Sequence, residues 1–256
     1  MKTTISNDVL SAAVAAVRSK RPLVHNITNY VVMNNSANAL LAIGASPVMA
    51  HWPREVEEMT SIADSLVLNI GTLDDVWLEG MRSAGAAASR RGIPIVLDPV
   101  GAGATKACTE ACLELISVCR PTIIRGNASE IMALVDAGVR SNGVDSSALS
   151  KDAVGAARQL AAETGVVVVI SGATDYITDG CVVHTVEGGD PIMTCVTGMG
   201  CTSTALIGAF AATIEDPLVA ATAAMAVMSL AGERAAAVSR GNGSMQVNFL
   251  DELYRL

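Results

Sequence analysis

Aromatic residues are scarce in this chain of 256 residues: only 3% are Phe, Trp or Tyr, although 51% are hydrophobic. A core with so few large rings must be built from aliphatic side chains in tightly stacked helices and strands. A chain of this length can bury a sizeable core, as one large α/β domain or at most two small domains. We find no linker rich in Pro or Ser, no low-complexity tract and no repeat, so we predict a single domain over residues 1–256.

Basic residues are also in deficit, since 17 Lys and Arg stand against 25 Asp and Glu and the formal net charge is −8. Nucleic-acid binding calls for a basic face, so this balance argues against a nucleic-acid partner. The six cysteines form no CxxC pair and no metal-binding spacing with His, which favours reduced thiols in a cytoplasmic protein.

A membrane-spanning segment is not expected either. The N-terminal stretch is typical of an amphipathic helix and lacks the layout of a signal peptide. The most apolar long run, residues 217–232, is rich in Ala and is soon followed by Glu233 and Arg234. This run therefore predicts a buried core helix, and we expect no membrane partner.

What the chain does contain is a regular alternation of short apolar runs with segments of helical length. Uninterrupted Val, Ile and Leu indicate burial on both faces, which is typical of a mostly parallel, doubly wound sheet covered by helices. The predicted strands are residues 23–26, 46–50, 65–71, 93–100, 122–127 and 166–172, and the predicted helices are 30–43, 53–63, 74–91, 105–119 and 151–164. A hairpin with an Asp179-Gly180 turn, helices over 201–213 and 217–239 and a short C-terminal helix complete the chain.

Polar loops follow five of these apolar strands: HNITN, NIGTLDD, DPVGAG, RGNASE and SGATD. In such a sheet, ligands bind beyond the carboxyl ends of the strands. Each loop by itself could be an ordinary solvated turn. Five in succession predict one shared cleft at this edge of the sheet.

The stretch VTGMGCTSTA has Gly198 and Gly200 directly before a predicted helix. Backbone N–H groups can converge there, and the helix start adds unpaired donors and a positive dipole end, so a phosphate or a developing anion is the expected ligand. A tight turn capped by Thr202 or Ser203 is the alternative. The helix start should lower the pKa of the Cys201 thiol and make it a base or nucleophile, unless Cys201 is only a small apolar residue beneath the turn.

Three other loops carry charged or hydroxyl groups. Asp98 ends an apolar strand, where it could hold Mg²⁺ or serve as a plain turn residue. Asn127 and Glu130 can form a capping box, and the same geometry directs a carboxylate into the cleft. Arg125 would be an unpaired charge unless it meets an anion, and Ser171 could contact a phosphate or ribose or cap its own loop.

Taken together, these segments resemble the ribokinase-like family of small-molecule kinases. DPVGAG, RGNASEI, VISGATD and TGMGCTSTA occur in the order typical of the family, and the resemblance covers nearly the whole chain. The segment PLVHNITNYVVMNNSANALLAIGASPVMA is its most specific part and is most similar to the thiazole kinases of this family. The resemblance implies an α/β fold, a three-layer α/β/α sandwich with a mostly parallel central sheet and no separate lid.

The resemblance also implies the reaction, which is phosphorylation of the hydroxyl of hydroxyethylthiazole by ATP in thiamine salvage. It implies Mg²⁺ as a cofactor and a homotrimer with substrate pockets between subunits. The wider family has a catalytic Asp where this chain has Cys201, as is usual for thiazole kinases. By position, the resemblance assigns the anion hole and the base to Gly198, Met199, Gly200 and Cys201. It assigns nucleotide contacts to Arg125, Ser171 and Asn127, and metal contacts to Glu130 and Asp98. The thiazole pocket is assigned to Met49, Asn29, Val31 and Gly198.

Relatives often have Thr at position 171, and some have a residue other than Asn at position 26. Three other functions compete with the thiazole kinase. A kinase for hydroxymethylpyrimidine or pyridoxal would usually have Asp at position 201. A ribokinase-like dehydratase would act on a damaged nicotinamide cofactor, and a non-catalytic binder of apolar ligands would bind thiazole without ATP turnover.

Overall fold

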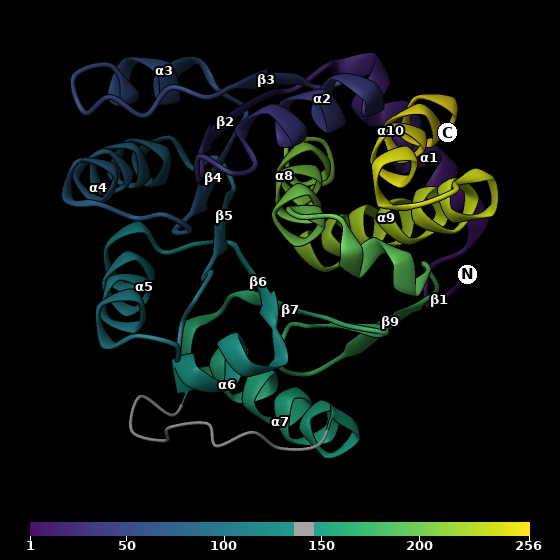
Figure 1. Ribbon diagram of the computed structural model, residues 1–256. Helices are drawn as coiled ribbons and strands as arrows, with labels where there is room; N and C mark the ends of the chain where they lie inside the picture. Colours follow the sequence, from purple (N-terminus) through teal and green to yellow (C-terminus); the bar gives the residue numbers. More distant parts are fainter. Residues whose placement is uncertain (136–145) are drawn as a thin grey trace.

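A computed structural model describes residues 1–135 and 146–256, within which nine strands form one sheet in the order β1-β9-β8-β7-β6-β5-β4-β2-β3 (Figure 1). The six strands from β3 to β7 in this order pair in parallel, whereas β8, β9 and β1 pair antiparallel, which confirms the predicted mostly parallel sheet. The strands are β1 Lys2–Thr3, β2 Leu23–Ile27, β3 Ser46–Val48, β4 Ser65–Asn69, β5 Ile95–Asp98, β6 Ile123–Asn127, β7 Val167–Ser171, β8 Thr174–Thr178 and β9 Val183–Glu187.

Helices cover both faces of the sheet and complete the three layers of the predicted sandwich (Figure 1). One face carries α1 Asn7–Lys20, α2 Met33–Ile43, α8 Met199–Ala211, α9 Pro217–Val238 and α10 Asn242–Arg255. The other face carries α3 Val56–Ile62, α4 Asp75–Arg91, α5 Lys106–Cys119, α6 Ala128–Val135 and α7 Ser146–Thr164. A short 3₁₀ helix, η1 Pro191–Cys195, connects β9 to the segment before α8.

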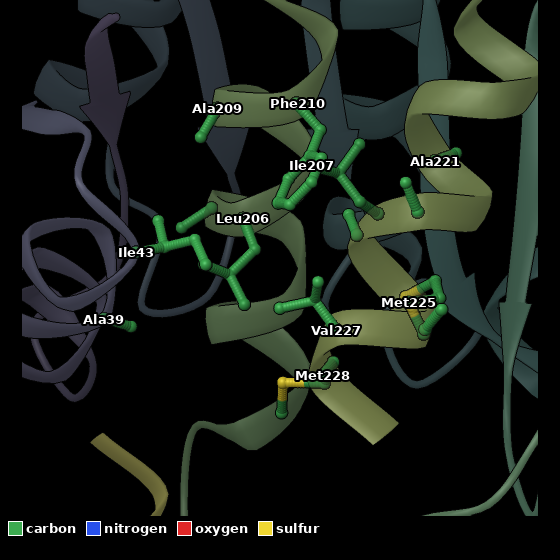
Figure 2. Packing of buried hydrophobic residues seen from close by; sticks show 14 of the residues in the cluster. Ala39, Ile43, Leu206, Ile207, Ala209, Phe210, Ala221, Met225, Val227 and Met228 are labelled. Atoms are coloured by element: carbon green, nitrogen blue, oxygen red, sulfur yellow. The ribbon is translucent and has the colours of Figure 1, made fainter. Parts of the chain in front are cut away.

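The larger core lies around α8 and α9, where aliphatic, Ala and Met side chains interlock with one another (Figure 2). Helix α9 is long and apolar enough to cross a membrane by length and composition, but 78% of its most apolar window is buried inside the fold. Ala221 and Val227 are fully buried on it, and Phe210 of α8 is one of the two Phe residues of the chain. Small side chains let α9 pack closely on all sides, which explains how a core with few aromatic rings is filled.

Several predicted boundaries shift for local reasons. Strand β5 begins at Ile95 and not at residue 93, since Pro94 has no N–H to donate to a neighbouring strand. Helix α2 begins at Met33 because the N–H groups of Val31 and Val32 bond to Asn29 in a tight turn. The C-terminal helix α10 has 14 residues, so its prediction as a short helix was wrong.

Candidate active site

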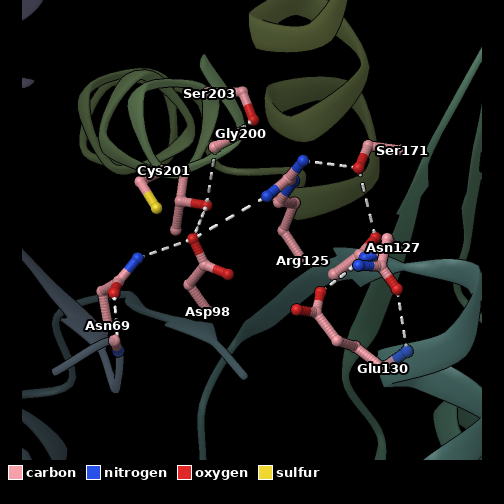
Figure 3. A network of polar contacts seen from close by, with 12 residues as sticks. Asn69, Asp98, Arg125, Asn127, Glu130, Ser171, Gly200, Cys201 and Ser203 are labelled. Atoms are coloured by element: carbon pink, nitrogen blue, oxygen red, sulfur yellow. Dashed lines mark hydrogen bonds and ion pairs between the residues drawn. The ribbon is translucent and has the colours of Figure 1, made fainter. Parts of the chain in front are cut away.

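One chain of polar contacts joins the carboxyl ends of five neighbouring strands (Figure 3). Asn29, just after β2, donates from Nδ2 to Oδ1 of Asn69 at the end of β4 over 2.8 Å. Asn69 in turn donates from Nδ2 to Oδ2 of Asp98 at the end of β5, also over 2.8 Å. Arg125 of β6 has Nη1 3.8 Å from that same oxygen and donates from Nη2 to Oγ of Ser171 at the end of β7. The structure therefore brings the predicted polar loops together at one edge of the sheet.

Helix α8 begins at this edge with exposed backbone donors. Gly198 precedes the helix with φ +81°, and the first helical bond runs from Thr202 N to Gly198 O over 2.8 Å. The N–H groups of Met199, Gly200 and Cys201 consequently have no partner among the residues that the structure describes. A Cβ on Gly198 would lie 2.6 Å from Cγ1 of Val32, so both space and φ favour glycine there. Such a helix start is suited to bind an anion.

The alternative interpretation, a turn capped by Thr202 or Ser203, was wrong. The residue that precedes the helix is Gly198, which has no side-chain cap. Thr202 instead accepts a hydrogen bond from Nδ2 of Asn35 over 2.7 Å, and Ser203 donates to Gly200 O over 2.7 Å.

The guanidinium of Arg125 lies directly against the first turn of α8. A Cβ on Gly200 would be 2.7 Å from Nη1 and 2.9 Å from Nη2 of Arg125, so only glycine leaves this space free. Arg125 was expected to be unpaired unless it meets an anion, and the carboxylate of Asp98 within the chain is such an anion. A fixed cation and the free N–H groups of α8 thus share one small region, and both favour a negatively charged ligand.

The Cys201 thiol lies on the other side of this helix start, within 3.6 Å of Nδ2 of Asn29. Burial and, second, the charge of Asp98 raise the pKa of the thiol to about 11, while contacts with Asn69 and Asn29 oppose this effect. The expectation that the helix start lowers this pKa was wrong, since lost hydration and a nearby carboxylate outweigh the helix dipole. Cys201 is therefore protonated at neutral pH in the ligand-free protein.

Asp98 is fully buried at the centre of these contacts. Its Oδ2 accepts hydrogen bonds from Asn69 and, over 2.8 Å, from Oγ1 of Thr204, whereas Oδ1 has no hydrogen-bond partner among the described residues. Burial raises the pKa of this carboxyl to about 6, although Arg125 acts in the opposite direction. An oxygen without a partner in a buried carboxylate is a position where a further donor or a cation would be stabilised.

Asn127 and Glu130 form the predicted capping box at the start of α6. Glu130 N donates to Oδ1 of Asn127 over 2.9 Å, and Asn127 N donates to Oε2 of Glu130 over 2.8 Å. The other oxygen of Glu130 accepts from Gly101 N over 3.1 Å, which ties the DPVGAG loop to α6. Each oxygen of Glu130 therefore has one bond and still has a lone pair available.

No group of three or more His, Cys, Asp or Glu residues in the described parts of the chain is placed to hold a metal ion alone. Mg²⁺ is nevertheless suited to one or two carboxylates that are completed by water and by substrate phosphates. The free Oδ1 of Asp98 and the half-exposed carboxylate of Glu130 meet that requirement. The donor set therefore fits Mg²⁺ bound together with a phosphate.

A cavity of about 880 Å³ opens beside the start of α8. Its wall includes Arg125, Ser171 and the segment 198–200, and it also includes Met225 and Met228 of α9. A cavity whose wall combines a cation with apolar side chains suits a molecule that carries both phosphates and a flat ring.

Not all predicted site residues lie at this cavity. Of the predicted site residues, the cavity wall includes Arg125, Ser171 and the segment 198–200. The others are not part of it: Asn29, Val31, Met49, Asp98, Asn127, Glu130 and Cys201. Val31 is 60% exposed and its neighbour Tyr30 is 61% exposed, so two apolar side chains stand on the surface next to buried Asn29.

Sequence reasoning assigned no individual role to three residues that belong to the site, although Asn69 and Asp175 lie in the predicted loops NIGTLDD and SGATD. Asn69 and Thr204 bind Asp98 directly. Asp175 lines the cavity and accepts from Gly172 N over 3.0 Å, and burial raises the pKa of its carboxyl to about 6. The polar residue at the end of each apolar strand was the available signal for Asn69. No comparable signal marked Thr204 within its helix.

Comparisons with known proteins agree on one family. A model described as the hydroxyethylthiazole kinase family matches residues 14–256. A protein named hydroxyethylthiazole kinase from Syntrophus aciditrophicus (strain SB) is 56% identical over 246 residues, which cover 96% of this chain and 91% of that protein. The solved structure of the hydroxyethylthiazole kinase protein from Pyrococcus horikoshii OT3 matches with TM-score 0.90 at 44% identity, covering 97% of this chain and 94% of the other. A pyridoxal kinase from Staphylococcus aureus matches in fold alone, with TM-score 0.65 at 19% identity, 83% of this chain and 88% of that one being covered.

Proposed function

The chain belongs to the hydroxyethylthiazole kinase family, and we propose from this premise how its residues carry out the reaction. The protein is a kinase that phosphorylates the hydroxyl group of hydroxyethylthiazole, with ATP as the co-substrate, in thiamine salvage. The observation that carries the proposed arrangement is the set of free N–H groups at the start of α8, directly beside the guanidinium of Arg125.

In our proposal, the N–H groups of Met199, Gly200 and Cys201 bind the γ-phosphate of ATP, with Gly198 as the turn that exposes them. Phosphoryl transfer has a loose transition state, so positioning and charge stabilisation contribute most of the rate enhancement. One preorganised donor of this kind contributes about 3 kcal/mol. Arg125 and Ser171 would bind the phosphate chain. The part of the cavity wall formed by Met225 and Met228 would hold the adenine ring.

The proposed role of Cys201 follows from its protonation. A thiol with a pKa of about 11 is a weak proton acceptor at neutral pH, so Cys201 would orient the substrate hydroxyl more than it would deprotonate it. Proton removal is late in a loose transition state, so a weak acceptor at this position is tolerated.

We assign the Mg²⁺ site to Glu130 and Asp98, with Asn127 holding Glu130 in place by the capping box. When bound, Mg²⁺ would neutralise charge on the phosphates. Arg125 and Thr204 orient Asp98 for this role.

We propose that Asn29, Val31, Met49 and Gly198 bind the thiazole, and that a partner subunit completes their pocket in a homotrimer. The exposed Tyr30 and Val31 beside Asn29 support a subunit interface here, because apolar side chains on the surface next to a buried site are suited to be covered. All six cysteines are free, which supports our proposal of a cytoplasmic location. One sheet takes strands from Lys2 to Glu187, which supports our proposal of a single domain.

The decisive experiment measures ADP release with Mg²⁺ and a panel of alcohols. We expect release that depends on hydroxyethylthiazole, with little turnover of hydroxymethylpyrimidine or pyridoxal. Release that is equally fast with the other alcohols would contradict the assigned substrate pocket. Scattering mass measurements across a dilution series test the trimer, and a monomer at all concentrations would contradict it.

A further inference from the structure

Asn69 is a buried amide whose three observed hydrogen bonds fix its orientation. It is 1% exposed at the end of β4. Its Oδ1 accepts from Asn29 Nδ2 over 2.8 Å and from Gly71 N over 3.0 Å. Its Nδ2 donates to Oδ2 of Asp98 over 2.8 Å. A rotated amide would place an NH₂ group against two donors and an oxygen against a carboxylate, so only one orientation is stable.

The residue that Asn69 holds on the substrate side, Asn29, has little freedom of its own. Asn29 donates from Nδ2 to Asn69 and towards the sulfur of Cys201, and its Oδ1 accepts from Val31 N over 3.1 Å. Gly71 packs against it so closely that a Cβ there would lie 2.7 Å from Nδ2 of Asn29. The orientation of Asn29 therefore sets the positions of both the Val31 backbone and the thiol contact.

We propose that Asn69 is a positioning residue that connects the two halves of the site. Its carbonyl oxygen holds Asn29 in the orientation that binds thiazole. Its amino group holds Asp98 on the phosphate side (Figure 3). Asn69 is 1% exposed and bonds directly to Asn29 and Asp98, so it acts through these neighbours. The inference rests on the proposed role of Asn29 in the thiazole pocket.

The test is calorimetric binding of hydroxyethylthiazole to the full chain, without ATP and without Mg²⁺. Asn69→Ala should weaken binding by about fivefold to tenfold, as expected when one positioned hydrogen bond is lost. Ser65→Ala is the matched control, because Ser65 is a fully buried polar residue of the same strand whose hydroxyl has no hydrogen-bond partner among the described residues.

A double-mutant cycle shows whether Asn69 acts through Asn29. In an Asn29→Ala background, adding Asn69→Ala should change the affinity by less than about twofold, because the group being positioned is already absent. Independent losses that multiply in the double variant would overturn the proposal. Unchanged affinity in Asn69→Ala would also overturn it.

If Asn69→Ala does not fold, Gly71→Ala tests the same contact from the other side. The added methyl group would displace Asn29 and should weaken thiazole binding by a similar factor, while unchanged binding would contradict the proposed positioning. If the proposed function is wrong, the parent protein shows no thiazole binding at all. If only this inference is wrong, the parent protein binds thiazole and Asn69→Ala binds it equally well.

Discussion

Gly200→Ala should damage catalysis without damaging the fold. The added Cβ would lie 2.7 Å from Nη1 and 2.9 Å from Nη2 of Arg125, and the guanidinium must retreat by about 0.7 Å to reach an ordinary contact distance. Arg125 is 8% exposed and lies between Asp98 and Ser171, so this movement stretches an ion pair that already spans 3.8 Å. A displacement near 1 Å of a positioning group costs about 10²-fold in rate. We therefore expect kcat/KM for ATP to fall by about two decades.

The stability of the same variant should hardly change. Alanine in a helix is favoured over glycine by about 0.5–1 kcal/mol, which offsets part of the strain near Arg125. Gly155→Ala is the matched control, since Gly155 is exposed in α7 and a Cβ there meets nothing within 4 Å. ADP release gives the rate, and urea unfolding gives the free energy of unfolding. The reasoning is refuted if Gly200→Ala turns over ATP at the parent's rate, or if its loss of activity is matched by a loss of stability of several kcal/mol.

Three further variants test the remaining assignments. Cys201→Ala should lower kcat in the ADP-release assay by about one to two decades. This is less than the ~10²–10⁴-fold contribution of an effective base, because burial keeps the thiol protonated. An unchanged kcat would exclude a role for the sulfur. Glu130→Gln should raise the Mg²⁺ concentration for half-maximal turnover, because a neutral amide replaces the carboxylate. It should lower the free energy of unfolding by about 1 kcal/mol, since Gln can still accept from Asn127 N but no longer offers an acceptor to Gly101 N; loss of stability alone would leave only the structural role. Asp175→Asn should be more stable than the parent at pH 7, by at most about 3 kcal/mol, because burial raises the pKa of Asp175 from 3.8 to about 6 and disfavours its charged form. This difference in free energy of unfolding should shrink as pH falls through 6 and vanish below about 4, where Asp175 is protonated in both the folded and the unfolded parent. An equal difference at pH 7 and pH 4 in urea unfolding would contradict the prediction.

Most of the fold could be predicted from the alternation of apolar runs and helical segments. Runs such as residues 66–68 and 167–170 are apolar at every position, and that pattern arises where helices cover both faces of a parallel sheet. Strand β1, which pairs with β9, was not predicted, because two residues carry no periodic signal. Strand pairing over such a distance depends on tertiary structure and not on local preference.

The site was predictable as a set of loops but not as a set of contacts. The glycines before α8 and the capping box of Asn127 and Glu130 have local signatures, and both are present as expected. The pKa of Cys201 has none, because it depends on burial and on Asp98, a residue 103 positions earlier in the chain. The partner of Arg125 was missed for the same reason, since adjacent strands bring Asp98 and Arg125 together only after the sheet forms.

The contacts at the strand ends also have a consequence for how the protein becomes active during folding. They take residues from Asn29 to Thr204, so no short segment of the chain contains a working site. Pairing of parallel strands between distant segments is slow compared with helix formation, since long loops must close first. Helices can therefore form while substrate binding is still absent. Enzymatic activity reports that the whole sheet has reached its final register, which recovery of helix content alone does not.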